Sequence, residues 1–245
     1  MRSRDKIAPL EIVVAALPDE QIAHAVCGLR DRYCQSCEQD SSQRLVPQDL
    51  VWDYLDPQER LSLDVESNLG LTKTGCKIAG QMIVYDQGGM IRVDAELSQR
   101  PLYPFTLAHE IGHWVLHRTA VIRWLQMLRD NGDNSTEFLT LNRDLGNKRS
   151  SICSPVEWQA NRFAVHLLMP SDLVIQEFRI RYGTVERRYC ELVASPSFVK
   201  HYADPMEYAR FMAHKGQSPS ERPLTKAFAT SVESMAIRLQ ELQLV

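Results

Sequence analysis

The stretch His109-Glu110-Ile111-Gly112-His113 decides how this sequence is interpreted. Residues 106–117 around it have the apolar spacing of a helix and contain no proline. Side chains four positions apart lie on the same helix face, so His109 and His113 can bind one metal ion together. The glutamate beside the first histidine is placed to act as a general base. The pattern predicts a zinc hydrolase site, although two histidines beside an acid also occur by chance.

A zinc site of this kind needs a third protein ligand. The metzincin pattern has a histidine six residues after the second one, but Thr119 occupies that position here. His117 would lie about 12 Å from His109 along a straight helix, and zinc–nitrogen bonds of about 2 Å cannot span that distance. We therefore expect His117 to support or pack against the site rather than bind the metal.

A second predicted helix, residues 157–169, offers Glu157 as the third ligand. We expect Ser154 to cap this helix, Pro155 to occupy its first position and Pro170 to end it. Glu157 has an alternative role, because Ser154-x-x-Glu157 is also a capping box. The two roles compete for the same carboxylate.

Asn161 favours the metal role for Glu157. It lies one turn later on the same face, where its amide can accept the free ring N–H of a metal-bound histidine. The small side chains of Ala160 and Ala164 would let this helix approach the first one closely. The predicted zinc ligands are therefore His109, His113 and Glu157, with Glu110 as the predicted general base. Manganese or another divalent ion is the alternative to zinc.

These two helices resemble the metal-binding helices of the ImmA/IrrE family of metallo-endopeptidases. The resemblance rests on Phe-Thr-Leu-Ala-His-Glu-Ile-Gly-His-Trp-Val-Leu-His (105–117), Glu-Trp-Gln-Ala-Asn-Arg-Phe-Ala (157–164) and Leu-Leu-Met-Pro (167–170). A weaker likeness extends over about residues 45–245, through a hairpin at 82–94 and a closing helix at 231–242.

The resemblance implies a mostly helical α+β fold of the zincin type, in its gluzincin form with two histidines and a downstream glutamate. It also implies a small antiparallel β-hairpin and a helical C-terminal tail. Known members cleave helix-turn-helix repressors of stress-response or mobile-element genes, so the expected partner is a protein substrate of that class. Residues 118–153 depart from the family pattern, and their role is open.

The expected organisation has three parts: an N-terminal helical part (1–75), a metallopeptidase core (76–200) and a helical segment packed on it (201–245). We place Gly88-Gly89 in the turn of the hairpin. The strand before the active helix is expected to pair with an extended peptide substrate. The remaining expected elements are helices at 19–33, 48–55, 118–128 and 171–182, a strand at 61–65, linkers at 35–44 and 217–223, and a loop at 130–136.

Charge and hydropathy favour a cytoplasmic enzyme. The net charge is −3 and the pI about 6.2, so no overall basic field favours nucleic acid. No apolar run approaches the roughly 18 residues that a membrane span needs. The run at 10–17 is short and interrupted by Glu11, which argues against a signal peptide.

The cysteines do not form the disulfide pattern of a small secreted protein. His24, Cys27, Cys34 and Cys37 have the residue types of a metal site. On one helix, however, Cys27 and Cys34 lie about 10 Å apart, and a shared ion would need a break near Tyr33. We therefore expect free thiols.

The tail carries an alternative function. Residues 224–239 read as two short helices joined at Thr230-Ser231, as in a DNA-binding regulator with a zinc-stabilised sensor domain. Residues 206–245 contain five basic and four acidic residues, a net charge of +1 that provides little for phosphate binding. We favour packing on the catalytic body through Leu224, Phe228, Met235, Leu239 and Leu242.

The residue that would stabilise an oxyanion is not identified by the sequence. The candidates are His117, His201, Tyr202 and His214, and each also fits a purely structural role.

Overall fold

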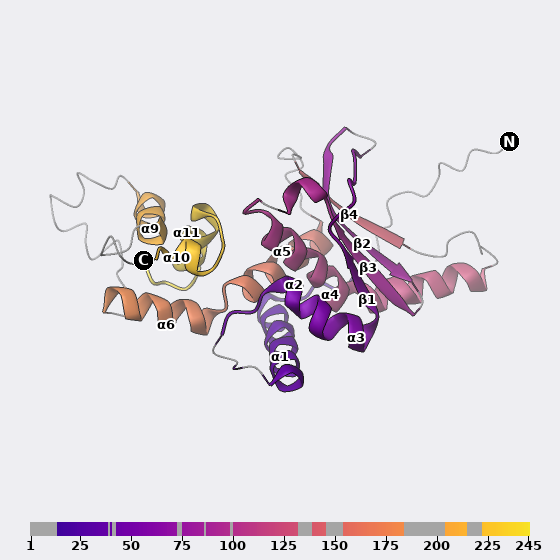
Figure 1. Cartoon of the computed structure of the whole chain (residues 1–245), viewed down its shortest axis with the longest axis horizontal. Helices are drawn as coiled ribbons and strands as arrows, with labels where there is room; N and C mark the ends of the chain where they lie inside the picture. Colours follow the sequence, from indigo (N-terminus) through magenta and orange to yellow (C-terminus); the bar gives the residue numbers. More distant parts are fainter. Residues whose placement is uncertain are drawn as a thin grey trace.

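The described part of the chain folds into helices and a four-stranded sheet (Figure 1). The computed structural model describes residues 14–38, 40, 43–72, 75–85, 87–98, 100–131, 139–145, 154–183, 204–214 and 222–245. Its elements are α1 (Asp19–Cys37), α2 (Pro47–Leu50), the π-helical turn η1 (Val51–Leu55), α3 (Asp56–Glu59), β1 (Leu61–Asp64), β2 (Lys77–Tyr85), β3 (Gly88–Val93), the 3₁₀ turn η2 (Ala95–Leu97), α4 (Tyr103–Asp130), β4 (Leu139–Leu145), α5 (Pro155–Leu168), α6 (Ser171–Tyr182), α9 (Pro205–His214), α10 (Leu224–Ala227) and α11 (Val232–Glu241).

This content confirms the mostly helical α+β class. Helix α1 continues to Cys37, so the linker predicted from residue 35 begins later. Helix α6 ends at Gly183 in the left-handed conformation (φ 67°). The predicted loop and the C-terminal linker fall largely outside the described residues, and the three-part division of the chain stays a prediction.

The sheet is mixed and has the order β1-β3-β2-β4. Strands β2 and β3 form the predicted antiparallel hairpin, and β1 pairs parallel to β3. The prediction that Gly88 and Gly89 form the turn is wrong, because both belong to β3 and pair with Tyr85 and Val84. The bend lies nearer Gln87 and is therefore tighter than expected.

Strand β4 comes from the segment between the two metal helices whose role was open. It pairs antiparallel with β2 along almost the whole length of that strand. Strand β3, which precedes the active helix, lies between β1 and β2. The prediction that a substrate adds to β3 is therefore wrong, because both of its edges already carry backbone partners.

One face of the sheet packs on α4. Alternate residues of β2 (Gly80, Met82, Val84) and of β3 point to this face and are buried. Trp114 of α4 is also buried there, and its indole N–H donates to Glu59 of α3 at 2.7 Å. The sheet and the short helices before it thus hold α4 in place from one side.

Helix α5 covers another side of α4 and approaches it closely at Gly112. A Cβ atom at this position would lie 3.0 Å from Phe163 Cβ and 3.2 Å from the Cα and O atoms of Ala160. Small residues at this crossing therefore let the two backbones meet, as Ala160 in the sequence predicts.

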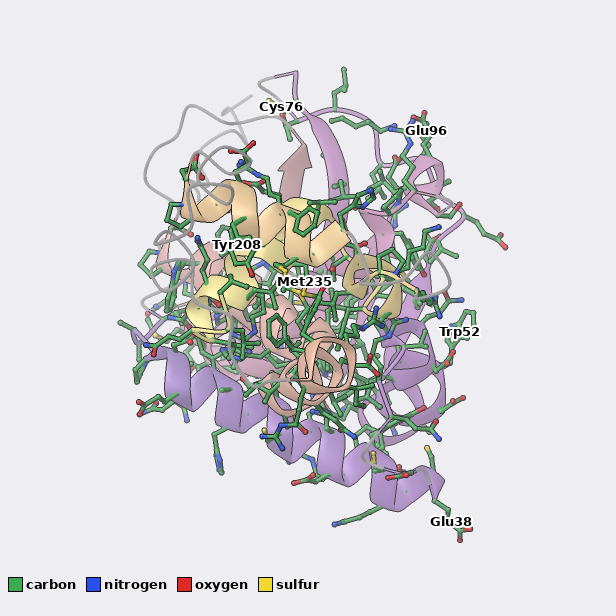
Figure 2. All side chains as sticks on the ribbon, turned by 90° about the vertical axis from the view of Figure 1, so that its left-hand side faces the viewer. Glu38, Trp52, Cys76, Glu96, Tyr208 and Met235 are labelled. Carbon is green, nitrogen blue, oxygen red and sulfur yellow. The ribbon has the colours of Figure 1, made fainter. Side chains whose placement is uncertain are left out.

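Helices α9, α10 and α11 form the C-terminal group at the end of the molecule opposite the sheet (Figure 1). Figure 2 shows Tyr208 and Met235 inside this group and Trp52 at the periphery. The residues expected to pack are buried or lie against the core: Leu224, Phe228, Met235, Leu239 and Leu242.

The outward face of α11 does not suit DNA. Its exposed positions are Glu233, Ile237 and Glu241, whereas its basic residue Arg238 is buried. The guanidinium of Arg238 donates to the carbonyl of Met169 at 3.1 Å and so ties α11 to the end of α5. Within the described residues, no helix is both long and apolar enough to cross a membrane.

Gly112→Val should lower the free energy of unfolding by about 1–3 kcal/mol, because the added side chain overpacks the α4–α5 contact. Gly28→Val is the matched control: a Cβ there meets only Arg32 Nη1, at 3.5 Å, and its effect should stay within about 0.5 kcal/mol. Chemical denaturation measures both, and equal effects would show that the crossing is not tightly packed.

Candidate metal centre

Helices α4 and α5 bring His109, His113 and Glu157 together. Within the described residues this is the group of three whose ligand atoms lie within 4.8 Å of one another. The two Nε2 atoms are 3.0 Å apart, and Glu157 places Oε2 3.2 Å from His109 Nε2 and Oε1 3.4 Å from His113 Nε2. Nitrogen or oxygen atoms bound to one tetrahedral zinc ion are about 3.4 Å apart. The three side chains therefore have the types and separations that one such ion requires.

The cap and the carboxylate of α5 have separate partners. Ser154 Oγ accepts the backbone N–H of Glu157 at 3.3 Å, as predicted for the N-cap. The Glu157 carboxylate is instead directed at the two histidines. Ser154 thus caps the helix through the main chain of Glu157, whereas the Glu157 carboxylate lies at the two histidines instead of reaching back as in a capping box.

Asn161 makes the contact expected of it. Its Oδ1 lies 3.0 Å from His109 Nδ1, and because an amide oxygen only accepts, the ring donates from Nδ1. In the neutral ring Nε2 then carries a lone pair directed towards Glu157 and His113. This is the tautomer that binds a metal ion.

Burial leaves the centre open only on its carboxylate side. His109 and His113 are each 1% exposed, whereas the Glu157 side chain is 33% exposed. Burial alone would raise the pKa of Glu157, but hydrogen bonds from His109 and His113 outweigh it and hold that pKa well below its usual range. A metal ion bound between the three side chains would take the place of the proton in such a bond.

Glu110 faces the sheet rather than the ligands of α5. It is fully buried, and a Cβ atom at Gly80 of β2 would lie 2.5 Å from its Oε1. Thr106, one turn earlier on α4, is buried beside the same point of β2. Any larger residue at position 80 would displace the Glu110 carboxylate or the Thr106 side chain from this position.

His117 is buried and does not join the three ligand atoms. Its Nδ1 lies 3.0 Å from His113 Nδ1, and its Nε2 lies 3.2 Å from Gln159 Oε1. The predicted supporting role is thus present, and the same contacts leave no ring nitrogen for an oxyanion. His214 is exposed at the end of α9, and His201 and Tyr202 lie outside the described residues.

Sequence reasoning missed Gln159. It is fully buried, two residues after Glu157, and also donates from Nε2 to the carbonyl of Ala15 at 3.0 Å. The available signal was a glutamine on the apolar side of α5. Its partner could not be predicted, because Ala15 is 144 positions away and its main-chain carbonyl is not marked by any residue type.

Residues 76–195 match the family model Peptidase_M78, described as the IrrE N-terminal-like domain. This region is an IrrE N-terminal-like domain. The match confirms the resemblance to the ImmA/IrrE family and contains both helices of the candidate metal centre. No curated protein matches the chain.

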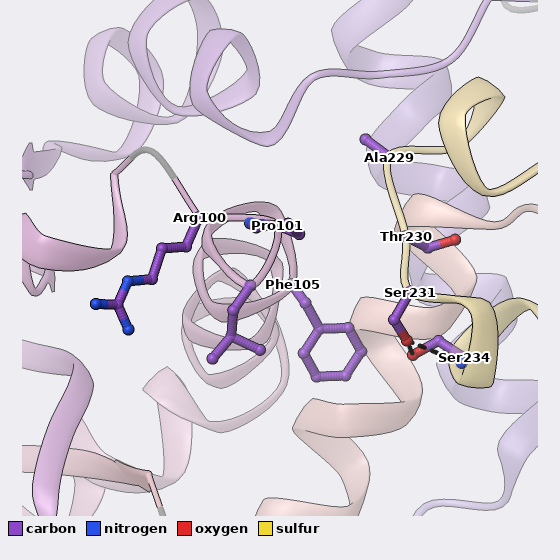
Figure 3. Close-up of a pocket in the computed structure, with 8 residues that line it drawn as sticks. Arg100, Pro101, Phe105, Ala229, Thr230, Ser231 and Ser234 are labelled. Carbon is purple, nitrogen blue, oxygen red and sulfur yellow. Dashed lines mark hydrogen bonds between the residues drawn. The ribbon is translucent and has the colours of Figure 1, made fainter.

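A hollow of about 510 Å³ lies between the start of α4 in the IrrE-like domain and the turn before α11 (Figure 3). Leu102 and Phe105 contribute to its apolar wall, and Ser231 and Ser234 lie across from Phe105 (Figure 3). A neighbouring hollow shares Arg100 and adds further cations, Arg222 and Lys226. Phe105 is one turn before His109 on α4, so the hollow lies at the end of the helix that bears the ligands.

The thiols outside the IrrE-like domain do not form a second metal site. Cys27, Cys34 and Cys37 are free and lie along α1, and no second group with metal-binding spacing occurs in the part of the chain that is described. Burial raises the pKa of Cys34, which favours the thiol over the thiolate. Helix α1 runs unbroken past Tyr33, whereas a shared ion would need a break there.

Protonation of His117 should make the metal-free protein less stable in acid. Burial, and then the charge of His113, lower its pKa from 6.5 to about 4. The unfolded chain therefore takes up the proton first, so the stabilising contribution is complete above about pH 6.5 and is lost as the pH falls to about 4. A shift of this size is worth up to about 3 kcal/mol.

The measurement is the free energy of unfolding from pH 7.5 to pH 4 in wild type and His117→Asn. The wild type should lose more stability, while His24→Asn, at an exposed histidine, should follow the wild type. Parallel curves for wild type and His117→Asn would contradict the depressed pKa.

Proposed function

We propose that this protein is a zinc-dependent endopeptidase of the gluzincin type that cleaves a helix-turn-helix repressor. The observation that carries the proposal is the convergence of His109, His113 and Glu157 at 3.0–3.4 Å, with Glu110 next to the first ligand. The peptidase-family match over residues 76–195 supports the reaction class. The substrate class rests on the resemblance to the ImmA/IrrE family.

Each residue has a distinct task in this proposal. His109, His113 and Glu157 would hold the ion, which when bound would lower the pKa of water towards about 7 and polarise a scissile carbonyl. Glu110 accepts the proton of the attacking water and later passes it to the leaving amine nitrogen. Its burial against β2 keeps its carboxylate in one place without making it a ligand.

The hollow at the start of α4 supports a peptide substrate with mixed chemistry. Leu102 and Phe105 suit an apolar side chain, and Arg100, Arg222 and Lys226 beside it suit an acidic one. Phe105 is about 6 Å along the helix from His109, so the hollow lies within the length of a short peptide from the metal centre.

Purified protein should contain about one zinc ion per chain, and His113→Ala and Glu157→Ala should lose it because two remaining ligands bind weakly. Glu233→Ala, at an exposed glutamate of α11, is the matched control and should keep its zinc. Metal content is measured by elemental analysis after dialysis. A full zinc content in Glu157→Ala would show that Glu157 is not a ligand and belongs only to the first turn of α5.

Cleavage of a helix-turn-helix repressor encoded beside this gene is the test of activity. Wild type with zinc should cut the repressor, a chelator should abolish the reaction, and Glu110→Gln should reduce the rate roughly 100- to 10,000-fold while keeping metal and fold. Undiminished cleavage by Glu110→Gln would remove this residue from the mechanism.

The control experiment titrates operator DNA with this protein alone. Intact repressor together with DNA binding that persists at about 200 mM salt would overturn the proposal in favour of a DNA-binding regulator, because non-specific phosphate contacts weaken steeply over that range. Weak, salt-sensitive binding is the expected result, given the acidic outward face of α11.

A further inference from the structure

A line of hydrogen bonds runs from the candidate metal centre to the chain segment before α1, buried along its course and partly exposed at its Ala15 end. His113 Nδ1 lies 3.0 Å from His117 Nδ1, His117 Nε2 lies 3.2 Å from Gln159 Oε1, and Gln159 Nε2 lies 3.0 Å from the carbonyl of Ala15. His113 is 1% exposed, and His117 and Gln159 are fully buried. Their ring and amide groups therefore depend on one another for hydrogen bonds.

The carbonyl of Ala15 determines which group donates and which accepts in every hydrogen bond of this line. A backbone carbonyl only accepts, so Gln159 must donate its Nε2–H to Ala15 and turn its Oε1 towards His117. An amide oxygen also only accepts, so His117 donates from Nε2. In the neutral ring, His117 Nδ1 then carries a lone pair and must accept, and His113 donates from Nδ1.

The last bond decides whether His113 can bind a metal ion. With its proton on Nδ1, neutral His113 has a lone pair on Nε2, the atom that faces Glu157 and lies 3.0 Å from His109 Nε2. With the line reversed, Nε2 would carry the proton and point it into the group of ligands. Only one of the two directions leaves His113 able to act as a ligand.

We propose that Gln159 and His117 are positioning residues that hold His113 in its metal-binding tautomer, with the Ala15 carbonyl as the fixed end of the line. This inference rests on the proposed metal site. It differs from the support of His109, which receives its direction from Asn161 in a single step. The segment before α1 thus takes part in the metal centre without touching a ligand.

The first test detects the tautomers in the metal-free protein, so its outcome does not depend on peptidase activity. Histidines labelled with ¹⁵N are observed by NMR at about pH 8, where an ordinary histidine is neutral. We expect His117 to be protonated at Nε2 and bare at Nδ1, and His113 to be protonated at Nδ1. A His117 ring protonated at Nδ1 and bare at Nε2 would overturn the proposal.

The second test measures metal affinity by competition between the protein and a chromogenic zinc chelator. His117→Phe removes the acceptor for His113, and Gln159→Met removes both ends of the amide; each should weaken zinc binding by roughly 10- to 100-fold, as loss of a ligand's hydrogen-bond partner does. His117→Asn should restore most of the affinity, because its Oδ1 can take the place of Nδ1 as acceptor.

His24→Phe is the control, because it replaces an exposed histidine of α1 that takes no part in the line of hydrogen bonds. It should bind zinc as tightly as wild type. Wild-type affinity in both His117→Phe and Gln159→Met would overturn the proposal, as would equal losses in His117→Phe and His117→Asn. Zinc affinity that follows the proposal without repressor cleavage would leave this inference standing and overturn the proposed function.

Discussion

The close crossing of α4 and α5 at Gly112 is the constraint on which the candidate centre depends. The histidines belong to one helix and Glu157 to the other, so the separation of their ligand atoms is set by how near the two backbones lie. Ala160 approaches within 3.2 Å of where a Cβ atom of Gly112 would be. A displacement of even about 1 Å there would carry Glu157 out of reach, because geometry at such sites tolerates only about half an ångström.

Helix geometry also separates Glu110, the proposed base, from the proposed ligands. His109 and His113 share the face of α4 that meets α5, and Glu110 is one residue further on, about 100° round the helix. That rotation turns it towards β2, where the absence of a side chain at Gly80 makes room for it. Helix α4 thus lies between the sheet, which packs against Glu110, and α5, which places Glu157 beside the two histidines.

The sequence predicted what depends on local spacing. The histidine pair, the start of α5 at Ser154 and the contact of Asn161 with His109 all follow from positions one turn apart or from residues at a helix end. The hairpin strands were also predicted, because their apolar alternation is local.

The rest depends on pairing between distant segments. Strand β4 lies in a polar-rich stretch with no clear alternation, and its pairing with β2 is set by tertiary structure. The parallel pairing of β1 with β3 also joins segments that are distant in the sequence, and it occupies the edge of β3 on which a peptide was expected to dock. The partner of Gln159 could not be predicted either, because it is a main-chain carbonyl, and every residue has one.

Helix α5 makes ion pairs with α1, near the start of the described chain, and with α11, near its end. Arg162 donates to both oxygens of Asp19 on α1, at 2.6 and 2.9 Å, and to Glu241 on α11. These bonds hold the pKa of Asp19 at about 2, so the pair stays ionised throughout the neutral range. Arg162 follows Asn161 directly, so α1 and α11 fix α5 on one side while the centre lies on the other. A helix fixed in this way keeps Glu157, Gln159 and Asn161 in register with α4, and the position of the ligands then depends on segments that contribute no ligand themselves.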